Sequence, residues 1–184
     1  MHARGIRWIG SALLVAVGLT MAPTAAAVTV PPHLAASQAM SPASDARAAS
    51  TAAQSLRKEV AALLQQYIDK YRSRFSDSEI QQLLGYRSNA DRQLATVVLT
   101  TNKVSYLTST AAAPAQRKVA TSRAMSAWTR AKATAETSWN EASRIMEPKL
   151  SLLEKLGATN DYNSMMGRFD DLGAQLRAIT KQQS

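Results

Sequence analysis

The chain has 184 residues, 22 basic and 13 acidic side chains, a formal net charge of +9 and no cysteine. The lack of cysteine excludes disulfides and thiol nucleophiles, so packing alone has to hold the fold. The two histidines are His2 and His33, and both precede the part of the chain that can form a core. This excludes Ser-His-Asp catalysis and the usual histidine-containing zinc or di-iron sites, and we predict no catalytic residue, no metal and no cofactor.

Residues 1–27 have the pattern of a secretory signal peptide. Arg4 and Arg7 form a basic start, residues 8–22 are apolar, and residues 24–27 supply the small side chains that a signal peptidase requires. The apolar stretch is shorter than the roughly 20 residues that span a bilayer, and glycines interrupt it. We therefore expect cleavage at the end of this segment, no transmembrane segment in the mature chain, and a periplasmic or secreted protein.

Residues 28–43 contain three prolines among small residues, which predicts a flexible leader without a helix. From about Ser44 the chain becomes rich in alanine, and residues 44–184 are expected to form one helical domain. The first helix is predicted from apolar residues that recur at spacings of three and four. These residues are Leu56, Val60, Leu63, Leu64, Tyr67, Tyr71 and Phe75.

The second helix is predicted to begin at Ser76, because Ser76 and Glu79 have the spacing of a capping box. Its apolar face runs from Ile80 to Val104, with Gly85 as a weak point inside it, and the helix should fade between residues 106 and 110.

The third helix is predicted to begin at Pro114, since proline is tolerated at the first helical position. Trp128 and Trp139 fall on one face of it, because eleven residues at about 100° each return to nearly the same direction. Alanines share that face and should let a neighbouring helix approach closely. Pro148 is expected to kink or end the helix near Met146.

After Pro148, leucines from Leu150 to Leu156 predict two further turns, which Gly157 should close. Thr159 or Asp161 is then expected to cap a last helix, whose apolar face extends over residues 162–179. No segment alternates as a strand does. The predicted fold is all-α, an antiparallel helical bundle of about four main helices after a cleaved signal peptide.

Positive charge is concentrated in residues 92–135, which contain seven basic residues and no acidic one. Arg123 and Arg130 lie seven residues apart and should project from one outward face of the third helix. Such a field attracts anionic partners, and the partner would be an envelope protein, an anionic surface component or nucleic acid. A solvated helix face without a partner explains the same pattern. The candidate binding residues are Arg117, Lys118, Arg123, Arg130 and Lys132.

Paired carboxylates are the one catalytic chemistry that the composition leaves open, because two acids can act as an acid and base pair. Acids at helix starts and on solvated helix faces explain the same residues. The pairs are Asp77 with Glu79, Glu136 with Glu141, and Asp170 with Asp171. The tryptophans and tyrosines could bind an apolar ligand, but their positions on the apolar stripes favour core packing.

Residues 75–94 resemble the signature of a family of exported bacterial helical proteins, found largely in Gram-negative periplasms and catalogued as a domain of unknown function. The family pattern reads Phe-Ser/Thr-x-x-Glu-Leu, a short spacer, then Phe-Tyr-x-Ser-Pro-x-Gly-x-Lys. The matching residues are Phe75, Ser76, Glu79, Tyr86 and Ser88, and the departures are Gly85, Asn89, Asp91 and Gln93. Because the Ser-Pro turn is missing here, we expect the second helix to continue through this segment. The resemblance implies an all-helical exported protein and supplies no activity.

These observations together predict an exported, non-enzymatic helical bundle that acts by surface interaction in the cell envelope, as a binding or chaperone-like protein. Binding of a polyanion by the basic stretch 92–132 is the first alternative. A hydrolase built on carboxylates is the second.

Overall fold

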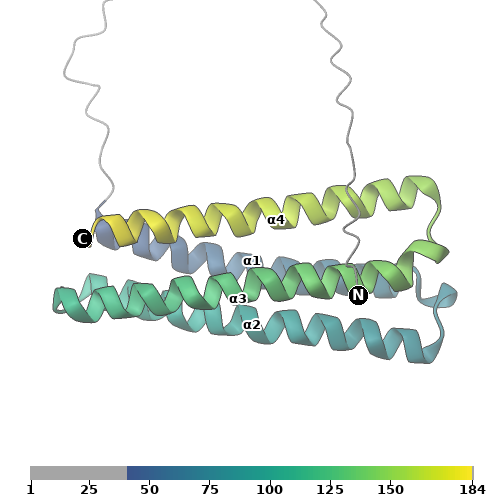
Figure 1. Ribbon diagram of the computed structural model, residues 1–184, viewed down its shortest axis with the longest axis horizontal. Coiled ribbons are helices and arrows are strands. Elements are labelled where there is room, and N and C mark those ends of the chain that lie inside the picture. Colours follow the sequence, from purple (N-terminus) through teal and green to yellow (C-terminus); the bar gives the residue numbers. More distant parts are fainter. Residues whose placement is uncertain (1–40, 184) are drawn as a thin grey trace, which may run out of the picture. The chain divides into compact units, whose positions relative to one another are not determined.

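The computed structural model describes residues 41–183, and within this range the chain forms four long antiparallel helices and no strand (Figure 1). The predicted all-α bundle is confirmed, whereas the signal peptide and most of the predicted leader lie outside the described residues. The elements are α1 (Pro42–Lys70), η1 (Arg72–Arg74), α2 (Asp77–Ser109), α3 (Pro114–Met146), η2 (Glu147–Lys149) and α4 (Leu152–Lys181). No helix between residues 41 and 183 combines the length and hydropathy that a membrane span requires.

The four helices form a closed ring around one core. α1 packs against α2 and α4, and α3 packs against the same two helices. Figure 1 shows the resulting up-and-down order, in which the α2–α3 connection lies at the same end of the bundle as the last turn of α4. α3 contributes mainly alanines to the core, whereas the other helices contribute larger apolar side chains such as Leu94, Phe169 and Ile179.

Aromatic side chains fill the core near the end that carries η1 and η2. The Trp139 ring stacks on the Tyr162 ring at a centroid distance of 5.8 Å and meets the Tyr67 ring edge-on, also at 5.8 Å. Offset and edge-on arrangements are those that aromatic pairs favour. The core-packing interpretation is confirmed for these residues, whereas Tyr106 is 60% exposed and lies outside the core.

Local signals in the sequence located most helix ends correctly. Ser76 caps α2, and its capping box with Glu79 is complete. α3 begins at Pro114 and ends at Met146, as predicted. α2 continues without a break through Gly85 to Ser109.

Two expected boundaries were wrong. α4 is one continuous helix from Leu152, so Gly157 does not end a segment. Ser151 and Glu154 form a capping box that sets the true start, and a glycine inside a helix costs only about 1 kcal/mol. α1 begins at Pro42, inside the expected leader, because proline fits the first helical position and Ser41 supplies the cap.

The two helical hairpins follow one pattern, with an offset of 75 residues. Each connection consists of a 3-10 turn, a buried apolar residue, and a serine and glutamate that form a capping box. The buried positions also correspond; examples are Ala49 with Ala124, Leu64 with Trp139, Leu94 with Phe169, and Val104 with Ile179. This repeat was not predicted, although the sequence contains a Ser-x-x-Glu box at the start of both α2 and α4.

Two ion pairs link the η1 and η2 connections and so join the two hairpins at that end of the bundle. Arg74 of η1 donates to the Glu154 carboxylate at 2.9 and 3.2 Å. Lys149 of η2 donates to Glu79 Oε2 at 2.8 Å. Each basic residue therefore binds the capping glutamate of the other hairpin.

Candidate functional site

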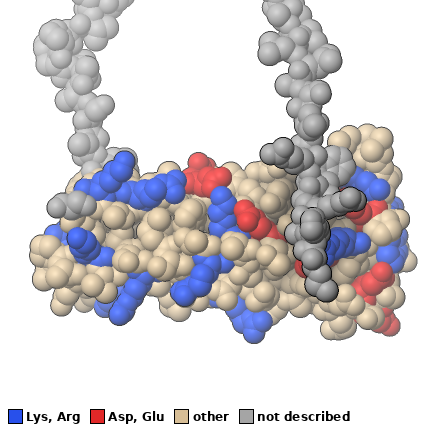
Figure 2. All heavy atoms as spheres, viewed as in Figure 1, with Lys and Arg blue, Asp and Glu red and all other residues tan. Residues whose placement is uncertain are grey.

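The acid-free stretch 92–135 occupies the C-terminal half of α2 and most of α3, two helices that pack side by side. When each helix is divided near its middle, residues 41–56, 93–130 and 167–183 form the half of the bundle with the α2–α3 connection. That half contains nine basic and three acidic residues. The other half contains eleven basic and ten acidic residues. Figure 2 shows basic side chains without acidic ones at this end of the visible face.

A groove of about 580 Å³ lies between α2 and α3 near their connection, and we call it the α2–α3 groove. Its walls are apolar and open to solvent, since Leu99 is 70% exposed and Val119 is 52% exposed. Its lining residues are Leu99, Thr100, Lys103, Leu107, Ala115, Gln116, Val119, Ala120 and Arg123.

Cations lie on both walls of the groove. Lys103 is on α2 and Arg123 is on α3, and both are exposed. Among residues 41–183 neither side chain forms an ion pair; the Lys103 ammonium lies 5.5 Å from the centroid of the neighbouring Tyr106 ring. Arg130 follows Arg123 by two turns on α3 and is likewise exposed and outside every ion pair in this range. The groove therefore combines apolar walls with cations that no acidic residue neutralises.

The structure divides the predicted basic patch. Arg123, Arg130 and Lys118 are exposed on α3, as expected. Arg117 is half-buried, and its Nε is buried without a hydrogen-bond partner in the described part of the chain. Lys132 lies elsewhere, because it faces α4.

The ammonium of Lys132 donates to Asp170 Oδ1 at 2.5 Å, so its charge is neutralised within the fold. Lys132 is nine residues beyond Arg123, which turns it to the opposite side of α3. The second cation of the groove is instead Lys103 of α2, which lies across the groove from Arg123 of α3. Lys103 belongs to the predicted basic stretch but was not among the predicted binding residues, although the short α2–α3 connection indicates that these helices are neighbours.

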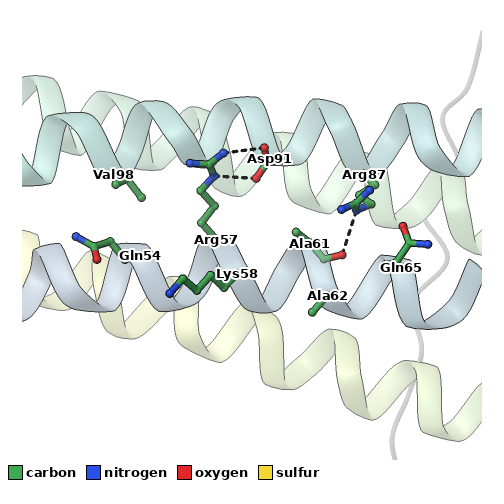
Figure 3. A pocket seen from close by; sticks show the side chains of 9 residues that line it. All are labelled: Gln54, Arg57, Lys58, Ala61, Ala62, Gln65, Arg87, Asp91 and Val98. Atoms are coloured by element: carbon green, nitrogen blue, oxygen red, sulfur yellow. Dashed lines mark hydrogen bonds and ion pairs between the residues drawn. The ribbon is translucent and has the colours of Figure 1, made fainter.

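A second groove, of about 520 Å³, lies between α1 and α2, and three of its four charged side chains are bonded within the fold, the exception in the described range being Lys58 (Figure 3). The Arg57 guanidinium donates to both carboxylate oxygens of Asp91, at 2.7 and 2.9 Å. This hydrogen bonding holds the pKa of the Asp91 carboxyl below its ordinary value. Arg87 donates to the carbonyl oxygen of Ala61 at 3.3 Å. The charged groups of Arg57, Asp91 and Arg87 thus have structural roles. Among the described residues, no ion pair gives Lys103 or Arg123 of the α2–α3 groove such a role.

The candidate carboxylate pairs also have structural partners. Glu79 belongs to the α2 capping box, and its hydrogen bond from Lys149 and those from Ser76 lower its pKa to about 2. At neutral pH it is therefore an anion rather than a proton donor. Glu141 accepts a hydrogen bond from Arg144 at 2.8 Å, and Asp170 accepts one from Lys132. One member of every pair is held in an ion pair, which agrees with the structural interpretation of these acids.

No protein-family model, curated protein or solved structure compared with the chain matches it. The resemblance of residues 75–94 to an exported helical family stays a prediction.

Proposed function

We propose that this protein is a non-enzymatic binding protein of the cell envelope, and that it binds an anionic partner through the faces of α2 and α3 that border the groove. The observation that carries the proposal is the presence of cations on both walls of an apolar groove, with no acidic residue to pair them among those described.

The internal repeat supports this proposal, because it shows what the bundle needs for folding. Four of the groove residues correspond to positions of α4 and α1 that carry small, uncharged side chains. The correspondences are Leu99 with Ala174, Lys103 with Ala178, Val119 with Ser44, and Arg123 with Ala48. Since the corresponding positions of α4 and α1 carry small residues within the same packing pattern, the fold does not require large apolar or basic side chains at these four groove positions.

Electrostatics supports the proposal as well. Nine basic residues against three acidic ones in one half of the bundle produce a positive field that raises the local concentration of anions and speeds encounter. Salt screens such exposed charges, with a Debye length of about 8 Å at physiological ionic strength. Binding should therefore weaken as the salt concentration rises.

The test is retention of the mature protein on immobilised heparin, compared between two double variants with equal net charge. Arg123→Glu with Arg130→Glu should elute at clearly lower salt than the wild type. Lys58→Glu with Arg72→Glu changes two exposed cations that form no ion pair among the described residues and lie in the other half of the bundle. This control should shift elution much less, and equal shifts would refute the proposed site.

A polyanion such as nucleic acid remains the second candidate partner, because Arg92, Arg123 and Arg130 are all exposed on the two helices that border the groove. Such a partner would contact the cations and leave the apolar walls without a role. Titration with single-stranded and double-stranded oligonucleotides separates the cases, since a polyanion-binding protein should bind them in a manner that depends on Arg123 but not on Leu99.

A further inference from the structure

We infer that the α2–α3 groove binds an acidic amphipathic α-helix of a partner protein. This inference rests on the proposed function and names the class of partner. Recognition of this kind places the apolar face of one helix into an apolar groove, with anchors at positions i, i+3 or i+4, and i+7.

The shape of the groove fits a helix. Its α2 wall extends from Leu99 to Leu107, a separation of eight residues or about 12 Å, which is roughly two helical turns. Alanines at positions 115 and 120 line the groove on α3, and small side chains let a partner helix approach closely. Leu99 and Val119 are more than half exposed on its two walls, so a helix in the groove would remove both from water.

The charges specify the polar edges of that helix. Lys103 on the α2 wall and Arg123 on the α3 wall place a cation on each side of the groove. A helix between them would have acidic residues along both edges of its apolar face. A basic helix would be repelled, because no acidic residue lies between positions 92 and 135.

Other occupants fit these observations less well. Small-molecule sites bury most of the ligand surface, whereas the walls of this groove stand open to solvent. A flat lipid surface would touch the projecting Leu99 and Val119 side chains but leave the groove between them unfilled. A partner helix contacts the walls and the interior at the same time.

The test uses designed peptides as probes and fluorescence anisotropy as the readout. The first peptide carries leucines at positions i, i+3, i+4 and i+7 of each repeat, with glutamates on both edges. The second carries lysines in place of the glutamates, and the third has the composition of the first in scrambled order. We expect the mature wild-type protein to bind the first peptide at least roughly ten-fold more tightly than the other two.

Two single variants then separate the groove from the charge. Leu99→Ser should weaken binding of the acidic peptide by roughly ten-fold, since a buried leucine contact is lost, and should leave heparin retention unchanged. Leu153→Ser is the control, because Leu153 is 80% exposed on α4 and does not line the groove. Both positions are exposed, so neither variant should unfold the bundle, and circular dichroism checks this.

The outcomes distinguish this inference from the proposed function. If Leu99→Ser binds the acidic peptide as the wild type does, or if the acidic and scrambled peptides bind equally, the helix-in-groove inference is wrong while heparin retention still supports the charged site. If the wild type instead co-sediments with phosphatidylglycerol vesicles and ignores the peptides, the surface binds lipid and the inference is overturned. If reversal of Arg123 and Arg130 changes neither heparin nor peptide binding, the proposed function fails with it.

Discussion

Gly173 of α4 lies directly against the indole ring of Trp128 on α3. A Cβ atom added at position 173 would come within 2.4 Å of Trp128 Cζ2. The indole Nε1 donates a hydrogen bond to the carbonyl oxygen of Phe169 at 2.8 Å, one turn before Gly173. The ring is thus held over a position of α4 that has no side chain.

We expect Gly173→Ala to destabilise the protein by about 1–2 kcal/mol, because overpacking against the fixed ring outweighs the gain of up to about 1 kcal/mol in helix propensity. Gly167→Ala is the matched control in the same helix, since a Cβ at Gly167 has nothing within 4 Å. The control should raise stability by up to about 1 kcal/mol. Urea unfolding of both variants measures the two effects, and equal stabilisation would contradict the described contact.

The hydroxyl of Tyr67 joins α1 to α4, because it donates to Asp161 Oδ2 at 2.7 Å. Burial and this acceptor raise the pKa of the Tyr67 hydroxyl, so it keeps its proton over the whole working range of pH. Tyr67→Phe keeps the ring in the aromatic cluster and removes only the donor. We expect a loss of about 1–2 kcal/mol in the free energy of unfolding.

Tyr86→Phe serves as the control for Tyr67→Phe. Tyr86 is half-buried on α2, and no hydrogen bond of its hydroxyl is found among residues 41–183. In thermal unfolding of the variants, the midpoint temperature of Tyr86→Phe should match that of the wild type, whereas that of Tyr67→Phe should be lower. A loss as large as that of Tyr67→Phe would show that the measured effect does not come from the Asp161 hydrogen bond.

The two capping glutamates should make stability depend on pH in the acid range. Ion pairs and capping hydrogen bonds lower the pKa of Glu79 and of Glu154 to about 2, from an ordinary value of 4.5. A carboxyl with a depressed pKa stabilises the folded state above its unfolded pKa, and this contribution is lost as the pH falls. The midpoint of urea unfolding should therefore decrease between about pH 5 and pH 2.

The variant Glu79→Gln with Glu154→Gln should be less stable than the wild type at pH 7 and should lose less stability on acidification. Asp171→Asn is the control, because Asp171 is exposed and belongs to no ion pair of the described range. It should keep the acid dependence of the wild type. If the double variant also keeps it in full, other carboxyls are responsible.

Export can be tested by the mass of the product. The small residues before Val28 are those that a signal peptidase requires, so expression in a Gram-negative host should yield a periplasmic protein that begins near Val28. Intact mass spectrometry of the periplasmic and cytosolic fractions reads this directly. A cytosolic product that retains residues 1–27 would contradict the predicted signal peptide and the envelope setting of the proposed function.

The sequence by itself determined the fold class and most helix ends. The signals that set these ends act on the backbone within one helical turn, so they can be recognised without knowledge of the tertiary structure. They are the capping box of Ser76 with Glu79, and the prolines Pro114 and Pro148. The errors at Pro42 and Gly157 are of the same local kind, since the caps at Ser41 and Ser151 were not recognised. Most buried positions followed from the spacing of apolar residues, because residues three and four apart share one face of a helix.

Only the tertiary structure decided which charges are neutralised and which stay free. Lys132 pairs with Asp170, which lies 38 residues away on another helix, whereas Lys103 lies across the groove from Arg123 and neither forms an ion pair in the described range. The physical reason is that each helix is rotated about its own axis to bury its apolar face. That rotation fixes the neighbours of every outward side chain, and the spacing of charges along one helix does not reveal it.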